Sequence, residues 1–340
     1  YTSENHGGGA ISCDIQEDPY GNLYIANEAG LLKFDGEHWS QMPATGQASY
    51  ISSIAIDTKD RIWISGLKSI GYYSTDSRGN YTFNDLTDSI SVLPQSSDFG
   101  VFWKLYAHDQ YIYLITSKHV LRWDGASWRT WDFQEQRRIL PSWIDDKLYI
   151  YARGTGLFYL NGDEFETVIQ ETPQIESGII SIIDMTENGL LCASRDNGLF
   201  YIKDGEIEQL PINFENPKVI VTRKLSNGTI AIGTEDKGVL IMNQTGQFVS
   251  HINHNSSFIY HIEESHDGTI WVTSMDAILQ IPDITLTSYS DSAHDIVRHQ
   301  QDLYYTNISE LKIIDSPAAG ALPTSRTLKQ KVSAVWDLHS

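Results

Sequence analysis

One short pattern returns along this chain: a small or polar residue, a short apolar run, and then Asp-Gly or a similar turn. It reads GLLKFDG at 30–36, HVLRWDG at 119–125, GLFYLNG at 156–162, GLFYIKDG at 198–205 and GVLIMNQTG at 238–246. Such a recurrence restricts the fold more than composition does, because a short repeated unit has to stack on its neighbours to bury its apolar faces.

The pattern belongs to a longer unit that occurs eight times, with copies 33 to 50 residues apart and about 40 on average. Each unit has an apolar run, a polar turn, a second run ending in small residues, the recurring pattern, and a last, more polar run. Runs of four to seven residues between Gly, Asp and Asn turns predict a four-stranded antiparallel meander. The second runs are aligned on Tyr24, Trp63, Tyr113, Tyr149, Leu191, Ala231, Trp271 and Tyr304.

About 40 residues and four strands per unit are typical of a β-propeller blade. We therefore expect an all-β fold, a propeller of four-stranded antiparallel blades. Eight units favour eight blades, and the alternative is seven blades plus one unit of a following domain. The expected boundaries are a lead-in or closing strand at 1–10, the propeller at 11–315, and a last outer strand with the start of a further unit at 316–340.

The charge of the chain excludes some partners. It has 340 residues with 24 Lys and Arg against 44 Asp and Glu, a formal net charge of −20. Binding to nucleic-acid phosphates or to anionic lipid headgroups needs clustered basic residues, which this sequence does not show. The two cysteines, Cys13 and Cys192, lie in apolar runs and are interpreted as small buried side chains. No apolar run of 18 residues is present.

The units resemble the regulator-propeller repeats. The runs ISCDIQEDPYGNLYIANEAGLLKFDG (11–36), ISSIAIDTKDRIWISGLKSIGYYSTDSRG (51–79) and YHIEESHDGTIWVTSMDAILQI (260–281) carry the resemblance, and units three, four and eight lack the turn glycine. These repeats form the periplasmic sensor region of bacterial hybrid two-component systems and related membrane receptors. The resemblance implies a ligand-sensing domain that forms one part of a longer receptor, with a kinase, DNA-binding or diguanylate cyclase output module.

The resemblance also implies the partners. A second propeller or an immunoglobulin-like domain of the same receptor would pack beside this one, and downstream segments would supply the only membrane contact. An alternative role is a scaffold that dimerises the receptor while the ligand binds elsewhere, and a third is a propeller lyase or glycosidase.

Sequence motifs for catalysis are missing, so we predict no enzymatic activity and no cofactor. There is no G-x-S-x-G elbow, H-E-x-x-H helix or phosphate-binding glycine loop. Carboxylates such as Asp18, Asp35, Asp57 and Asp124 fall in turns, where solvated side chains are the ordinary interpretation. Four histidines gather late in the chain, but strand positions three apart face opposite sides, so we predict no metal site. They are His251, His254, His261 and His266.

A ligand site is expected at one mouth of the propeller, where the loops between second and third strands meet the segments that lead into each blade. Arginines and aromatic rings gather there, a combination suited to an acidic or sugar ligand. The alternative is that these charges pair with neighbouring carboxylates. We call the predicted ligand-binding residues the mouth set: Arg153, Arg195, Arg137, Arg138, Trp103, Tyr50 and Tyr260. The function predicted from sequence is a periplasmic sensor domain that binds a small molecule such as a carbohydrate fragment.

Overall fold

A computed structural model describes residues 1–282 apart from 43–49, 68, 95, 134–138, 145, 186–188, 195, 213–216 and 253–257, and the backbone of four strands beyond residue 282. The described chain is almost entirely β. Its helical segments are short: α1 (Ser3–His6), α2 (Thr87–Ser91) and one 3-10 turn, η1 (Ser96–Asp98).

Seven antiparallel sheets follow one another along the chain, and an eighth comes after them. The first three contain β1 (Ser12–Glu17), β2 (Leu23–Asn27), β3 (Gly30–Phe34) and β4 (Trp39–Gln41); β5 (Ile51–Ile56), β6 (Ile62–Gly66), β7 (Ile70–Thr75) and β8 (Tyr81–Asp85); and β9 (Lys104–His108), β10 (Tyr111–Ile115), β11 (His119–Trp123) and β12 (Trp128–Asp132).

The next four contain β13 (Ile139–Ile144), β14 (Lys147–Ala152), β15 (Gly156–Asn161) and β16 (Glu164–Gln170); β17 (Ser181–Asp184), β18 (Leu190–Ser194), β19 (Gly198–Lys203) and β20 (Glu206–Gln209); β21 (Val219–Lys224), β22 (Ile230–Thr234), β23 (Val239–Met242) and β24 (Phe248–Ile252); and β25 (Ile259–Glu264), β26 (Ile270–Ser274) and β27 (Ile278–Ile281).

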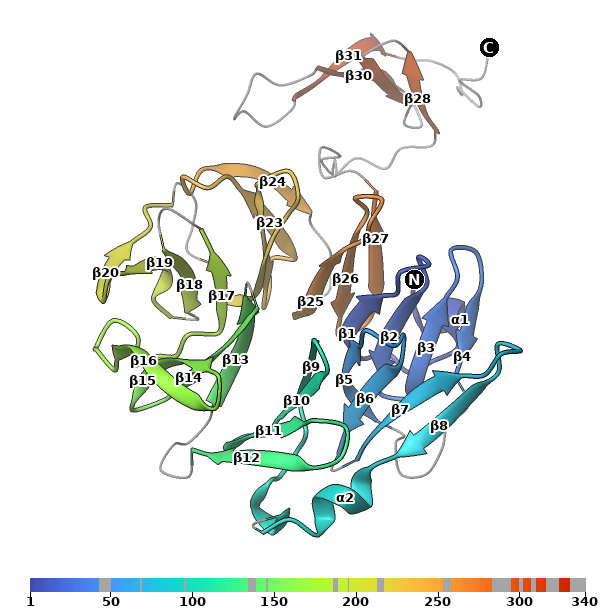
Figure 1. Cartoon of the computed structure of the whole chain (residues 1–340). Coiled ribbons are helices and arrows are strands. Elements are labelled where there is room, and N and C mark those ends of the chain that lie inside the picture. The colour runs from blue at the N-terminus through green and yellow to red at the C-terminus, as the bar shows by residue number, and fades with distance from the viewer. Residues whose placement is uncertain are drawn as a thin grey trace.

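These seven sheets are the blades of a propeller, arranged in a ring with β1, β5, β9, β13, β17, β21 and β25 innermost (Figure 1). The prediction of a propeller with four-stranded antiparallel blades is confirmed. The ring holds seven blades, one fewer than the repeat units counted in the sequence. The eighth unit forms a separate four-stranded sheet of β28 (Asp295–His299), β29 (Asp302–Thr306), β30 (Glu310–Asp315) and β31 (Thr324–Gln330).

Hydrophobic packing between neighbouring blades holds the seven-bladed ring closed. The described residues form seven apolar clusters, and each one joins two neighbouring blades. The closing cluster packs Trp271 and Ile278 of the last blade against Ile15, Leu23 and Phe34 of the first. Because burying one large apolar side chain is worth about 1.5–3 kcal/mol, an open ring would forfeit one complete cluster.

The start of the chain adds a second closing contact. Tyr1 and Ile278 exchange two backbone hydrogen bonds, of 2.7 and 2.8 Å, on the outer edge of β27. The Tyr1 ring contacts Phe34, Trp39 and Trp271, so one residue bridges the last blade and the first. Among the described residues the last blade has three strands, and Tyr1 pairs along the outer edge of the third.

The recurring Asp-Gly pattern is a turn between the third and fourth strands. In the first blade, Asp35 Oδ1 accepts hydrogen bonds from the backbone N–H groups of Glu37 and His38, and Gly36 has a φ of 97°. A positive φ favours glycine, and an aspartate that accepts bonds from the following N–H groups stabilises a tight turn. The pattern is therefore structural.

The interpretation of Asp18 and Asp57 as solvated turn residues was wrong, because both are buried. Asp57 accepts hydrogen bonds from the backbone of Arg61 and from Trp63 Nε1, the latter at 2.8 Å. Asp18 likewise accepts one from the Tyr24 hydroxyl at 3.2 Å. Each aspartate thus fastens the first turn of its blade to the aromatic residue six positions later.

Candidate functional site

A cavity of about 400 Å³ lies on the propeller axis, lined by the innermost strands of all seven blades. We call it the axial cavity. Trp103, Tyr260 and Pro141 line it near the N-terminal ends of their strands, the end at which the chain enters each blade. A second hollow of about 490 Å³ lies toward the C-terminal ends of three inner strands, between β13, β17 and β21.

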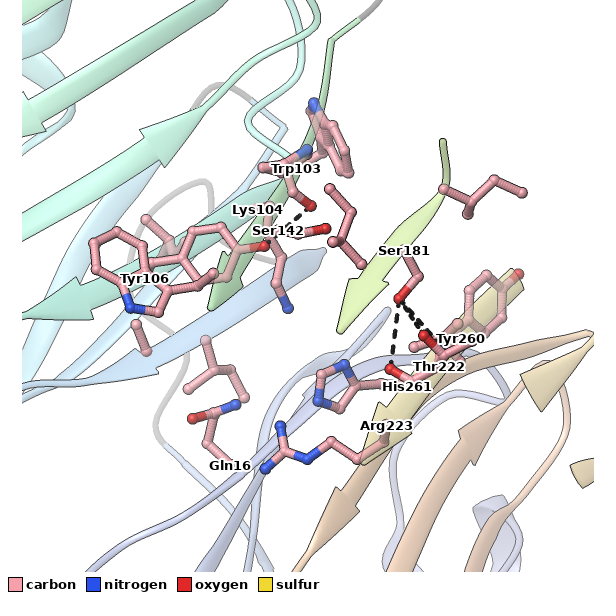
Figure 2. Close-up of a pocket in the computed structure, with 18 of the residues that line it drawn as sticks. Gln16, Trp103, Lys104, Tyr106, Ser142, Ser181, Thr222, Arg223, Tyr260 and His261 are labelled. Atoms are coloured by element: carbon pink, nitrogen blue, oxygen red, sulfur yellow. Dashed lines mark hydrogen bonds between the residues drawn. The ribbon is translucent and has the colours of Figure 1, made fainter. Parts of the chain in front are cut away.

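Hydroxyl groups from several blades line part of the axial cavity. Ser181 Oγ lies 2.8 Å from Thr222 Oγ1 and accepts a hydrogen bond from the Thr222 backbone N–H (Figure 2). The Tyr106 hydroxyl donates to the Pro141 carbonyl at 3.4 Å, and burial raises the pKa of Tyr106 far above its usual value. The phenol therefore stays neutral, and these hydroxyl groups are uncharged donors and acceptors.

The charged residues of the lining are organised by Asp14, which is 1% exposed. Its Oδ2 lies 2.9 Å from Lys104 Nζ, and its Oδ1 lies 3.4 Å from His261 Nδ1. Ser53 Oγ donates to Asp14 Oδ2 at 2.5 Å. Burial alone would raise the pKa of Asp14, but Lys104, His261 and the hydrogen bond from Ser53 outweigh it, so that pKa lies below its usual value. Asp14 is therefore a buried carboxylate that stays ionised.

Further polar contacts connect His261 with Arg223 of the sixth blade. His261 Nε2 lies 3.6 Å from Glu263 Oε2, and Glu263 Oε1 accepts a hydrogen bond of 3.1 Å from Arg223 NH2. The order Lys104, Asp14, His261, Glu263, Arg223 links β9, β1, β25 and β21 around the cavity. We call these five residues the axial network.

β-Bulges place members of this network. The register shifts just before Asp14 in β1, Ser53 in β5 and His261 in β25. A bulge interrupts the alternation of a strand and turns the next side chain toward a new direction. All three residues interact through the Asp14 carboxylate, so the irregular backbone of the inner strands is what brings their side chains together.

The structure distributes the mouth set unevenly. Trp103 and Tyr260 line the axial cavity. Tyr50 lies in the segment that leads into β5, with its hydroxyl 3.4 Å from Cys13 Sγ, and this hydrogen bond raises the pKa of Tyr50 above its usual value. Arg153 is exposed in the loop between β14 and β15 and does not line the cavity. The remaining members, Arg137, Arg138 and Arg195, lie outside the described residues.

Sequence reasoning missed most of the axial network because it considered the loops and not the inner strands. A signal was present: Asp14, Lys104 and Arg223 are charged residues inside first-strand segments, where apolar side chains predominate. His261 was noticed only as one of four histidines for which a metal site was rejected, and it is 15% exposed.

The described residues contain no group of three or more His, Cys, Asp or Glu side chains placed to bind a metal ion. Among the helices in this part of the chain, none combines the length and apolar character needed to cross a membrane.

No protein-family model and no curated protein matches the chain. Solved structures do share its fold. The extracellular domain of BT4673 from B. thetaiotaomicron, described as a one component or hybrid two component system, has a TM-score of 0.62 at 16% identity and aligns over 94% of this chain and 46% of its own. The extracellular domain of BT3049, a hybrid two component system from the same organism, has a TM-score of 0.63 at 15% identity. It aligns over 90% of this chain and 46% of its own.

A virginiamycin B lyase from Staphylococcus aureus also has this fold, with a TM-score of 0.62 at 13% identity over 82% of this chain and 95% of its own. Identities this low show the fold alone, a seven-bladed propeller. The chain spans about half the length of the two extracellular domains. Those two domains are of the class that the repeats resemble, so the resemblance read from sequence agrees with the structural neighbours.

Proposed function

We propose that this chain is a regulator-propeller domain that senses a small molecule, such as a carbohydrate fragment, in the periplasm as part of a bacterial membrane receptor. The axial cavity carries this proposal. Its volume of about 400 Å³ falls in the range of small-ligand sites, and it combines aromatic rings with a few fixed polar groups. Trp103 and Tyr260 would contact the apolar faces of a sugar, and Ser181 and Thr222 its hydroxyls.

The mouth set has a supporting role in this proposal. Arg153 is exposed and forms no ion pair with a described residue, so its guanidinium is available to a ligand that extends out of the cavity. Arg137, Arg138 and Arg195 remain proposed contacts from the same sequence argument. Tyr50 would complete the mouth beside Tyr260, whose hydroxyl is close enough to contribute to the raised pKa of Tyr50.

The domain binds its ligand without converting it. General acid–base catalysis needs a side chain that can reach a substrate proton. In the axial cavity the candidate base is His261, and both of its ring nitrogens face carboxylates, at 3.4 and 3.6 Å. This arrangement supports binding over catalysis. The similarity to extracellular receptor domains supports the location, and a second domain of the same receptor or a second copy of the chain would be the protein partner.

A panel of neutral and acidic oligosaccharides tests the proposal. A ligand present at 100 times its Kd stabilises the folded state by about 2.7 kcal/mol, which raises the melting temperature by several degrees. We expect at least one member to do so and to bind Tyr260→Ala more weakly than Tyr20→Ala, since Tyr20 is a 76% exposed tyrosine outside the cavity. Product formation from any bound sugar would favour the enzyme alternative instead.

A further inference from the structure

The charge of the axial cavity is opposite to that of the whole chain. The formal net charge is −20, yet the charged side chains that line the cavity are Lys104 and Arg223, with His261 beside them and no Asp or Glu among the described residues. Their carboxylate partners, Asp14 and Glu263, do not line the cavity and are 1% and 13% exposed. A ligand in the cavity therefore meets cationic groups first.

The cations retain binding capacity toward the cavity. Arg223 is 43% exposed. A guanidinium carries five N–H donors, and the structure shows one of them, on Arg223 Nη2, donating to Glu263. Lys104 is 19% exposed and gives one hydrogen bond to Asp14, out of three available to an ammonium group. Figure 2 shows Lys104, His261 and Arg223 reaching from three blades toward the same part of the cavity, with Gln16 beside them.

The carboxylates behind the cations do not cancel this preference. Asp14 also accepts hydrogen bonds from Ser53 and from the Ile54 backbone N–H, so its charge is satisfied within the protein. A guest in the cavity would touch the lysine and guanidinium nitrogens directly, whereas the carboxylates lie one contact further away. Because Coulomb energies fall with distance, the nearer cations dominate.

We propose that the axial cavity binds an oxyanion, namely a carboxylate, sulfate or phosphate group of the ligand, through Arg223 and Lys104 with His261 and Gln16 beside them. The proposal rests on the proposed function, since it specifies the chemistry of the ligand of that same cavity. The acidic group would enter the axial cavity itself, which places it apart from Arg153 and the other arginines of the mouth set. A fork of guanidinium N–H donors suits the paired oxygens of such a group.

Calorimetric titration at constant ionic strength tests the proposal with matched probes: glucuronate against glucose, and inorganic sulfate and phosphate. We expect the protein to bind glucuronate more tightly than glucose, and Arg223→Gln to weaken glucuronate binding by about 10- to 150-fold, the loss expected for a hydrogen bond to a charged group. Affinity for sulfate or phosphate would then identify which oxyanion fits best.

Arg129→Gln is the control, because Arg129 of β12 is 48% exposed and pairs with Asp163 in the turn between β15 and β16 of the next blade, much as Arg223 pairs with Glu263 of the next blade. It should leave glucuronate binding unchanged. Glu263→Gln provides a change in the opposite direction: removing the carboxylate that holds Arg223 should tighten binding. This variant keeps the proposal testable if Arg223→Gln folds poorly.

Three results would overturn the proposal. The first is equal affinity for glucose and glucuronate. The second is an equal loss of glucuronate affinity in Arg223→Gln and Arg129→Gln. The third is the absence of saturable binding of any of the four probes. Equal affinity for the two sugars would leave the proposed function standing, because a neutral ligand would still occupy the cavity. Failure of the whole oligosaccharide panel would instead contradict the proposed function itself.

Discussion

Lys104 Nζ lies 2.9 Å from Asp14 Oδ2, although the two residues are 90 positions apart in the sequence. The contact joins β9 of the third blade to β1 of the first and passes over β5, whose Ser53 donates to the same oxygen. Three successive blades are thus tied together at the axis through one buried carboxylate. The same lysine lines the axial cavity, so this contact connects the stability of the ring with the proposed ligand site.

Removing the lysine should destabilise the fold strongly. Lys104→Met leaves the buried Asp14 carboxylate without its lysine, although Ser53, the Ile54 N–H and His261 stay beside it. Breaking a buried ion pair in this way costs roughly 3–5 kcal/mol. Urea unfolding measures the change, with Lys59→Met as the control because Lys59 is exposed and should shift stability by less than about 0.5 kcal/mol. Equal stability of the two variants would refute a structural role for the pair.

The same contact makes stability depend on pH. The folded-state pKa of Asp14 lies below its usual value, so the ionised form contributes stability that is complete above the unfolded pKa of about 3.9 and is lost as pH falls toward the folded value. The difference in free energy of unfolding between the wild type and Asp14→Asn should be constant from neutral pH to about pH 5 and shrink below about pH 4.

Asp196→Asn, at an exposed aspartate, serves as the reference for this pH series. The difference in free energy of unfolding between this variant and the wild type should stay small across the whole pH series. A gap between the wild type and Asp14→Asn that widens on acidification would mean that the Asp14 pKa is shifted in the opposite direction.

Tyr1 should contribute measurably to ring closure. Tyr1→Ala removes ring contacts to Phe34, Trp39 and Trp271 while leaving the backbone pair with Ile278 possible, and we expect a loss of about 1–2 kcal/mol. Thermal unfolding compares it with Tyr20→Ala, whose side chain is 76% exposed. If both tyrosines can be removed at the same small cost, hydrophobic packing between β1 and the last blade closes the ring alone.

Arg153 tests the outer part of the proposed site. Because it is exposed and forms no ion pair with a described residue, Arg153→Ala should leave the melting temperature nearly unchanged. If a bound oligosaccharide reaches the mouth, its affinity should fall by about 10- to 150-fold in calorimetric titration. Wild-type affinity in this variant would confine the ligand to the axial cavity.

The sequence predicted the blades because each one is fixed by local signals, namely the turn glycines and the Asp-Gly pattern. Even the bond between Asp57 and Trp63 has a local signature, an aspartate six positions before the aromatic residue. The number of blades in the ring has no such signature. It depends on whether Trp271 and Ile278 can pack against Ile15, which is settled only when the whole ring is assembled.

The candidate site was only partly predictable for a related reason. Trp103 and Tyr260 were found because they stand in segments that lead into blades, and such segments meet at the mouth of any propeller. Asp14 was missed, and His261 was not assigned to the cavity, because bulges redirect their side chains, and a bulge breaks the alternation from which side-chain direction is read.

The location of the ligand is decided by a crystal structure of the protein with the tightest-binding member of the oligosaccharide panel. We expect the sugar to occupy the axial cavity, in contact with Trp103 and Tyr260, with an acidic group beside Arg223 and Lys104. A sugar bound intact on the outer faces of the blades, with the axial cavity holding only solvent, would contradict it.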